Sequence, residues 1–509
     1  MKDDDLEITT CDAGNGSSPH RPEQQNDHDC FQYLERTEDP TSWPHWRKWS
    51  IVSCVAVMYM LANFGTVIIV PAVPLILSHF QVSGNLYQPL IVSIWELGEG
   101  VGSFVVGPLS ELYGRNVVYH GGNILFILRS VAAALSQNAS MLVAFRFING
   151  MAVTSLTLAP SIIGDLFVQE ERGAAMAVAI ALPLIGPCVA PIVGGFVNSA
   201  LGWRWTIWIM AITVGSVSLL SLAVFKETYR FKIQQQSRKS TEKKQDRGDG
   251  NHNIPSSSSH PSAPRDTVLK SIIRPALILF SSPVVLVTSL YTALTYGISY
   301  LILTTLAEIM QKTYGFGEGP VGITFLGRAI GNIVGLCVYG LVSDRYVKHR
   351  RAMKGESKPE HRLPLMIFGT AMLPIGLLLY GWSANKHVHW IVPLIGTGII
   401  GFSMLLTKLP TENYLVDAFD EQGVSASALS ANATLCALFG AFFPLAGPLS
   451  NHSLGLGWGN SLLAFLSLIF CRCLLCCGYM GRSSGSWGGD ITEGPLLLRT
   501  LQKVNQIEG

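Results

Sequence analysis

Two long apolar segments of this chain are joined by the stretch Gly107-Pro108-Leu109-Ser110-Glu111-Leu112-Tyr113-Gly114-Arg115-Asn116-Val117-Val118-Tyr119. Each segment has about twenty apolar residues, which is the length that a helix needs to cross the hydrocarbon core of a bilayer. Gly107 and Gly114 would let the two helix ends approach each other, and Glu111 and Arg115 fall where lipid gives way to water. The stretch therefore predicts two membrane-spanning helices joined by a tight, charged turn.

The composition of the whole chain also indicates a membrane protein. Of the 509 residues, 49% are hydrophobic and only 14% are charged, whereas about a quarter of the residues of a soluble domain are charged. We predict an all-α membrane protein with about twelve spans, because membrane strands would need alternating polarity. The predicted spans are 50–75, 87–110, 116–136, 141–165, 173–199, 205–225, 281–309, 320–341, 363–383, 390–415, 424–449 and 459–479.

Several other classes of protein do not fit the sequence. A net charge of +2 is too small to indicate nucleic-acid binding. No Gly-Lys dipeptide occurs, so the chain contains no Walker A phosphate loop and no ATPase motor of its own. The cysteine-rich stretch 471–477 contains no His or Asp, which argues against a metal site. We expect no enzyme activity, no cofactor and no bound metal.

Basic residues predict the orientation in the membrane. The loop after span 6 holds eleven Lys and Arg and the loop after span 8 holds seven, whereas the loops on the opposite side hold only Arg204, Lys312 and Lys386. Cytosolic loops carry the excess of basic residues. We therefore expect a multi-pass protein of the cell membrane with both termini in the cytosol. No cleavable signal peptide is expected, since the first 47 residues have no apolar core.

The spans are expected to form two halves of six. A weak internal repeat supports this division, because Gly107-x-x-Ser110-Glu111 is echoed by Gly340-x-x-Ser343-Asp344. The segment between the halves is rich in Ser, Gln, Lys and Pro and cannot bury apolar area. The predicted parts are a disordered cytosolic tail at 1–47, a six-helix bundle at 48–228, a disordered cytosolic loop at 229–275, a second six-helix bundle at 276–480 and a cytosolic tail at 481–509.

Charged residues inside the predicted spans are candidates for proton coupling. Arg146 lies in span 4, where a guanidinium costs a few kcal/mol or more unless it faces the protein interior and has a partner. Glu96 and Glu99 in span 2 are three residues apart and share one helix face. Burial favours a neutral carboxyl group and a nearby arginine favours the ionised form, so such a group can titrate. We predict that Glu99 or Glu96 carries a proton and that Arg146 tunes it; a structural ion pair is the alternative.

Two further cations and several aromatic residues also lie inside the spans. Arg328 and Lys408 either contact an acidic substrate or extend outward to the membrane surface, and we predict the outward course for Arg328. Three roles remain open for the aromatic residues: lining a central cavity, packing inside the protein, or facing lipid. These residues are Trp95, Tyr291, Tyr296 and Tyr300.

Span 5 contains Gly186-Pro187-x-x-Ala190-Pro191-x-x-Gly194-Gly195, which should bend the helix and let a neighbouring helix approach. This run resembles the span-5 motif of antiporters in the major facilitator superfamily, with Ala190 in place of the usual glycine. Leu142-x-x-x-Arg146-x-x-Asn149-Gly150 resembles the superfamily's span-4 motif, whose arginine is linked to proton transfer. The 107–119 stretch resembles its loop between helices 2 and 3.

This last resemblance implies that Gly107, Glu111, Gly114 and Arg115 form a charge-paired latch at the cytosolic face, whereas a plain topological stop signal is the alternative. Further stretches have the order and spacing found in fungal drug:proton antiporters with twelve spans. They are Pro71-x-x-Pro74, Asp165-Leu166-Phe167, Gly202-Trp203-Arg204-Trp205, Glu227-Thr228-Tyr229 and Tyr414-Leu415-Val416-Asp417-Ala418-Phe419.

The resemblance implies a secondary active exporter of hydrophobic small molecules, such as a toxin, a secondary metabolite or a drug, in exchange for protons. We expect a monomer in the lipid bilayer, without nucleic-acid partners. Two alternatives remain open: a proton-coupled uptake permease for a small organic nutrient, and a membrane sensor that transports nothing. Asn138-Ala-Ser and Asn451-His-Ser fall in predicted outside loops and are candidate glycosylation sites.

Overall fold

A computed structural model of the chain describes residues 40–82, 86–167, 175, 179, 182–184, 186–228, 283–354, 363–419 and 425–483. These residues form helices joined by short connections, and no strand occurs among them. Ten helical segments in the described ranges are long and apolar enough to cross a membrane, and two shorter apolar helices, Ala139–Met151 and Val189–Leu201, lie where spans 4 and 5 were predicted. The predicted fold, an all-α membrane protein with twelve spans in two bundles, is confirmed.

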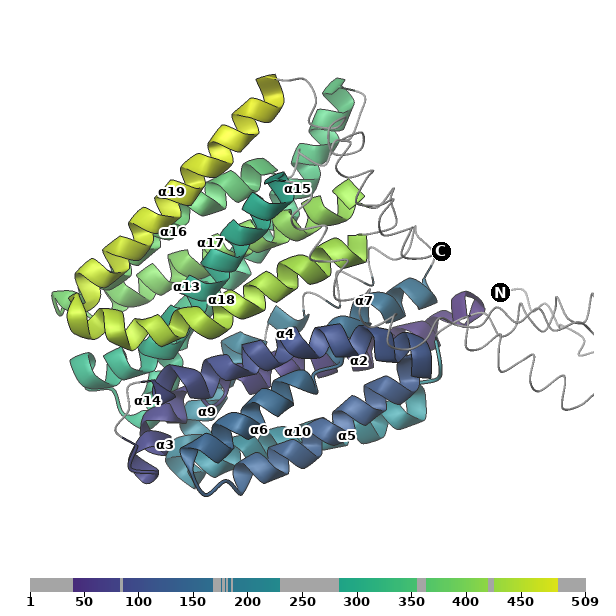
Figure 1. Cartoon of the computed structure of the whole chain (residues 1–509), viewed down its shortest axis with the longest axis horizontal. Helices are drawn as coiled ribbons and strands as arrows, with labels where there is room; N and C mark the ends of the chain where they lie inside the picture. Colours follow the sequence, from purple (N-terminus) through teal and green to yellow (C-terminus); the bar gives the residue numbers. More distant parts are fainter. Residues whose placement is uncertain are drawn as a thin grey trace, which may run out of the picture.

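The first group of helices precedes residue 229. Its elements are η1 (Pro40–Ser42), α2 (His45–Val67), η2 (Val70–Ala72), α3 (Val73–His79), α4 (Tyr87–Tyr113), α5 (Arg115–Ala134), α6 (Ala139–Met151), α7 (Ser155–Leu166), η3 (Leu182–Leu184), α9 (Gly186–Leu201) and α10 (Trp203–Val224). In Figure 1 this group is drawn in purple to teal.

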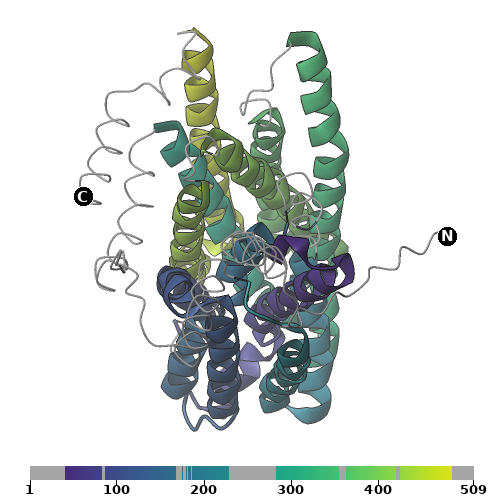
Figure 2. The same cartoon turned by 90° about the vertical axis from the view of Figure 1, so that its right-hand side faces the viewer.

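The second group begins at residue 283. Its elements are α13 (Pro283–Tyr314), α14 (Glu318–Val321), η4 (Gly322–Phe325), α15 (Leu326–Lys354), α16 (Leu363–Asn385), α17 (Ile391–Phe419), α18 (Ser425–Ser453) and α19 (Gly455–Ser483). Figure 2, which is turned by 90° from Figure 1, shows the second group stacked on the first.

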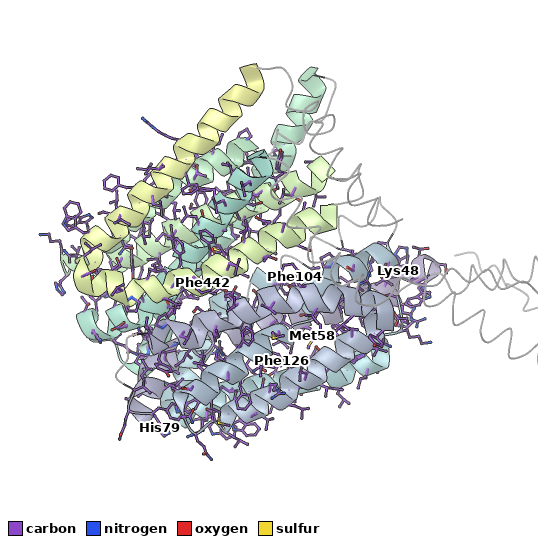
Figure 3. All side chains as sticks on the ribbon, in the orientation of Figure 1. Lys48, Met58, His79, Phe104, Phe126 and Phe442 are labelled. Carbon is purple, nitrogen blue, oxygen red and sulfur yellow. The ribbon has the colours of Figure 1, made fainter. Side chains whose placement is uncertain are left out.

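The two groups touch along a limited set of elements. The main contacts between them join α4 to α18, and α9 to α14 and η4. Figure 3 labels Lys48 and His79 near opposite ends of the first group. By the basic-residue argument, the His79 end is the predicted outer end and the Lys48 end the predicted cytosolic end. The contacts of α9 with α14 and η4 gather at the predicted outer end (Figure 1).

Predicted span 4 is not one continuous helix, so this part of the prediction was wrong. Helix α6 ends at Met151 and α7 begins at Ser155. The intervening residues 152–154 are at most 5% exposed. A side chain on Gly122 of α5 would place its Cβ only 2.2 Å from Thr154, so the glycine leaves room for the break. A break in a membrane helix is tolerated where protein rather than lipid surrounds the backbone.

Parts of the predicted domain plan lie outside the described residues. They include residues 1–39 of the predicted tail, the predicted central loop at 229–275, most of 173–185 in span 5, and the chain after 483. The domain boundaries therefore remain predictions.

Candidate functional site

The turn between α4 and α5 consists of Gly114 alone. Its φ of 93° lies in the region that favours glycine, since a Cβ would clash there. Gly107 instead lies inside α4, and a Cβ added to it would meet nothing within 4 Å. Gly107 therefore does not bring the helix ends together, contrary to the prediction. The side chain of Glu111 lies outside the described part of the structure.

Arg115 ties this turn to the ends of two other helices. Its Nε lies 3.3 Å from Asp165 Oδ2 at the end of α7, and its guanidinium also donates to Ser110. Its backbone N–H donates to Glu227 Oε1 at 2.9 Å, so a carboxylate from beyond α10 caps the start of α5. A carboxylate at a helix N-terminus is favourable because of the helix dipole. Asp165 and Glu227 occur in stretches that the sequence resemblance included, although neither was assigned this role.

Arg146 is buried in the first group, at 4% exposure, and binds the end of α2. Its Nη2 donates to Thr66 O at 2.8 Å, and both Nη atoms lie 3.5 Å from Gly65 O. These carbonyls belong to the last turn of α2, where no further helical N–H satisfies them. The guanidinium carbon also lies 5.0 Å from the Trp95 ring centroid. Within the described chain, no carboxylate oxygen lies within 4.0 Å of this guanidinium.

A small cavity inside the first group is lined on one side by Trp95. Its polar lining comes from Arg146, Asn149 and Ser130, and Phe126, labelled in Figure 3, forms part of its apolar wall. It has room for about one water molecule. Arg146 Nε and Asn149 Oδ1 are buried without a hydrogen-bond partner among the described atoms. The cavity is too small for an organic substrate.

The predicted carboxylates meet polar side chains of the second group at the centre of the molecule. Tyr296 of α13 donates its hydroxyl hydrogen to Glu96 Oε2 of α4 at 2.9 Å, and the Tyr296 and Tyr300 hydroxyls are 3.4 Å apart. Glu96 is 3% exposed. Gly440 of α18 packs beside this pair, because a Cβ there would lie 3.0 Å from the Tyr296 ring. A neutral phenol thus satisfies a buried carboxylate across the junction of the two groups.

Lys408 and Glu412 of α17 complete this arrangement. Their Nζ and Oε1 atoms are 3.8 Å apart, and the two side chains are 30% and 29% exposed. Lys408 Nζ also lies 5.4 Å from the centroid of the Tyr296 ring. Glu99, one turn after Glu96 on α4, is partly exposed. We call these residues, together with Tyr59 of α2, the central cluster: Tyr59, Glu96, Glu99, Tyr296, Tyr300, Lys408 and Glu412.

The sequence found part of the central cluster and missed part of it. Glu412 was overlooked, although its position four residues after Lys408 puts both on one face of a helix. Tyr59 carries no sequence signal of its own, because only the fold places it near the charges of Glu99 and Lys408. Tyr291 was a candidate for lining the cavity, but it is fully buried within the second group and donates to Thr370 O.

The prediction for Arg328 was wrong. This side chain is 8% exposed and donates to the backbone carbonyl of Ser299, inside the second group. It therefore does not extend to the membrane surface. Asn332, one turn later on the same helix, is also buried at 8%.

The glycine-rich motif of span 5 packs mainly on α2. A Cβ on Gly186 would lie 2.7 Å from Met60 O, and one on Gly194 would lie 2.0 Å from Ile68 O. Pro191 contacts the other group, since a Cβ on Gly322 of η4 would lie 2.4 Å from Pro191 O. Gly195 is buried and Pro187 is half-buried in the same helix. The motif thus sits between α2 and the second group at the predicted outer end.

The two candidate glycosylation sites differ in structure. Asn138 is exposed and caps α6, because its Oδ1 accepts from the Met141 backbone N–H at 2.8 Å. Asn451 lies in the last turn of α18 rather than in a loop, contrary to the prediction. Glycosylation at either position remains a prediction. In the described ranges, no group of three or more His, Cys, Asp and Glu could hold a metal ion.

Comparison with known proteins gives consistent matches. The profile of the Major Facilitator Superfamily matches residues 55–444. The chain is 39% identical over 468 residues to the MFS-type transporter penM of Penicillium rubens, covering 92% of this chain and 91% of that protein. It is 38% identical over 433 residues to the efflux pump radE of Floropilus chiversii, covering 84% and 79%.

Solved structures resemble the fold. A partially occluded inward open conformation of the xylose transporter XylE from E. coli matches with a TM-score of 0.63 at 16% identity, covering 84% of this chain and 96% of that one. The human organic anion transporter MFSD10 (TETRAN) matches with a TM-score of 0.58 at 17% identity, covering 85% and 100%.

Proposed function

The chain belongs to the Major Facilitator Superfamily, and we propose that it exports hydrophobic small molecules in exchange for protons. It is a multi-pass membrane transporter, as its relatives named transporters and efflux pumps are. The name of radE, an efflux pump at 38% identity, supports export over uptake. The span-5 resemblance to antiporters supports exchange with protons.

The observation that carries the proposal is the carboxylate pair at the junction of the two groups. Glu96 and Glu99 lie near the middle of the 27-residue helix α4, so they lie near the middle of the membrane. Ionisable groups at that depth are costly and mark ion pathways. We assign proton exchange to Glu99, because it is partly exposed whereas Glu96 is buried and bound by Tyr296.

Arg146 has a different part in this proposal from the one that the sequence suggested. Its guanidinium binds the carbonyls of α2 and acts on Glu96 only through its charge, together with Lys408. Lys408 acts on both Glu96 and Glu99 and comes from the opposite group. We therefore propose that both cations tune the carboxylates, Arg146 from the first group and Lys408 from the second.

The Arg115 network is proposed as the cytosolic latch. It joins the start of α5 to the end of α7 and to the segment after α10. Its position follows the orientation expected from the basic residues, with both termini in the cytosol and the protein in the cell membrane. Breaking it would change the preference between inward-facing and outward-facing states.

The available driving force is sufficient for export. One proton that moves inward across about 100 mV and down about one pH unit releases about 2.3 and about 1.4 kcal/mol, respectively. The sum supports a gradient of a few hundred-fold for a neutral substrate, since each 1.4 kcal/mol is about tenfold. Such a gradient would suffice to protect a cell from its own toxic product.

The test uses the purified full chain in liposomes that contain 2-naphthol, a neutral fluorescent dye with a hydroxyl group, and a pH indicator in the lumen. An acid step outside should drive dye out and acidify the lumen faster than in protein-free liposomes. Glu99→Gln should abolish both signals at normal expression, and Glu99→Asp, which keeps a carboxylate, should retain part of them.

Two results would count against the proposal. Dye efflux without extra acidification would remove proton exchange. Dye uptake that follows the proton inward would instead identify an uptake permease.

A further inference from the structure

We propose that the substrates are uncharged amphipathic molecules whose hydroxyl group donates a hydrogen bond to Glu99. This inference rests on the proposed export function and adds the chemical class of the substrate. The size and apolarity of a substrate do not specify a hydrogen-bond donor, so this donor is a separate requirement for recognition.

The central cluster has more hydrogen-bond acceptors than donors. It holds three carboxylates, those of Glu96, Glu99 and Glu412, against one ammonium and three tyrosine hydroxyls. The ammonium, that of Lys408, is already paired with Glu412 at 3.8 Å, and the Tyr296 hydroxyl already donates to Glu96. Among the described residues, no Lys or Arg nitrogen lies within 4.0 Å of a carboxylate oxygen of Glu96 or Glu99. Each carboxylate offers about four acceptor positions. The cluster is therefore suited to a ligand that brings donors.

The structure already contains one example of the proposed bond. Tyr296 is a hydroxyl on an apolar ring, and it donates to Glu96 at 2.9 Å from the opposite group. The pair lies between α4 and α18, which are closely packed, since a Cβ on Gly440 would lie 3.5 Å from Glu96 Cγ. A neutral O–H donor thus satisfies a carboxylate of this cluster without a cation in contact.

Glu99 is the carboxylate that a ligand can reach. It lies one turn after Glu96 on the same face of α4. Glu96 is 3% exposed, whereas Glu99 is partly exposed and the side chains of Lys408 and Glu412 are 30% and 29% exposed. The half-buried rings of Tyr59 and Tyr296, from opposite groups, can pack against the apolar body of a ligand. The ligand's hydroxyl then reaches Glu99 as the Tyr296 hydroxyl reaches Glu96.

The sign of the coupling agrees with exchange. A hydrogen bond donated to a carboxylate stabilises its ionised form, so the hydroxyl and the proton compete for Glu99. A carboxylate ligand would have the opposite effect, because its negative charge beside three carboxylates would favour retention of the proton. A substrate that expels the proton on binding should therefore be an uncharged donor rather than an anion.

The experiment compares three probes with the same apolar body and different head groups: 4-hexylphenol, 4-hexylanisole and 4-hexylbenzoate. Their binding to the purified full chain in detergent is measured by calorimetry, and proton release is followed with an indicator dye in weak buffer. The phenol should bind about tenfold or more tightly than the anisole, as expected for a hydrogen bond to a charged group. It should also release protons, and the benzoate should bind most weakly.

Glu99→Gln should reduce the phenol-to-anisole ratio to below about threefold and remove the proton release, since the ionised acceptor is gone. Glu99→Asp should keep both. If Glu99→Gln does not fold, proton release by the unchanged protein is measured across a pH series with the phenol and with the anisole. The inference holds if only the phenol releases protons, and it is overturned if both probes or neither do so.

Equal affinity of phenol and anisole, or preferred binding of the benzoate, overturns the inference. These results leave proton exchange in liposomes untouched as a separate observation. Conversely, discrimination by head group without proton-driven dye efflux would support the recognition and overturn the export proposal.

Discussion

At the scale of the residue, Arg146 shows how a buried charge can be stabilised without an opposite charge in contact. Its position within a membrane helix predicted a partner, and the obvious candidates were Glu96 and Glu99. The guanidinium instead bonds to Thr66 O and packs on the Trp95 ring. The free carbonyls at the end of α2 carry the negative end of a helix dipole, which favours a cation. No feature of the local sequence reveals that α2 ends beside this side chain.

The two glycines of the α4–α5 turn should respond in opposite ways to alanine. Gly114→Ala should destabilise the protein by about 1–3 kcal/mol, because its φ of 93° is strained for any other residue. Gly107→Ala should stabilise it by about 0.5–1 kcal/mol, because this glycine is helical and has free space around it. Thermal unfolding in detergent measures both, and a loss of stability in Gly107→Ala would show that our placement of this glycine is wrong.

At the scale of the element, the position of α4 depends on glycines that let it approach α6. A Cβ on Gly98 would lie 2.1 Å from Phe147 O, and one on Gly150 would lie 2.2 Å from Trp95 O. Small residues allow such backbone contact in membrane helices, where packing rather than water drives association. Glu96 and Glu99 lie on this stretch of α4. The α4–α6 contact therefore fixes the positions of both carboxylates in the central cluster.

Gly150→Ala should therefore disturb both stability and exchange. The added methyl group overlaps the Trp95 backbone and should cost about 1–3 kcal/mol, as overpacking does. It should also slow proton-driven transport by moving α4. Gly121→Ala is the matched control, because it adds the same methyl group to a membrane helix where nothing lies within 4 Å. Thermal unfolding and liposome transport, measured on both variants, should separate them; similar losses in both would contradict the packing argument.

At the scale of the whole molecule, the two groups approach each other closely at the predicted outer end. Helix α9 contacts α14 and η4 there, and Pro191 of the span-5 motif lies against Gly322. Gln88 of α4 also donates to Glu308 of α13 at 2.6 Å across the two groups. Transport by alternating access requires that such contacts open, because a rigid outer end would hold the cavity shut on that side.

A disulfide across this contact should stop transport. A Cβ on Gly319 of α14 would lie 3.2 Å from Ser199 Oγ of α9, a spacing close to that of a disulfide's atoms. Ser199→Cys combined with Gly319→Cys should transport when reduced, lose transport on oxidation and recover it with a reductant. Each single substitution serves as a control that should stay active under oxidation. Undiminished transport by the oxidised, cross-linked protein would mean that this contact does not open.

The all-α membrane fold, the order of twelve spans and the family resemblance could be predicted from the sequence alone. These features depend on local properties: the length of apolar runs, the placement of basic residues and the order of short motifs. The sequence also placed Glu96 and Glu99 on one helix face, since that follows from helical spacing alone.

Which side chains meet could not be predicted from the sequence and is seen only in the folded chain. Tyr296 and Glu96 are 200 positions apart in the chain, and their hydrogen bond depends on how two bundles pack. The contacts of Arg146 with the end of α2 and of Arg115 with Asp165 depend on helix packing in the same way, as does the burial of Arg328. The break between α6 and α7 likewise has room only because Gly122 of a neighbouring helix has no side chain. A local pattern cannot specify such contacts, because their energy depends on neighbours that folding alone brings together.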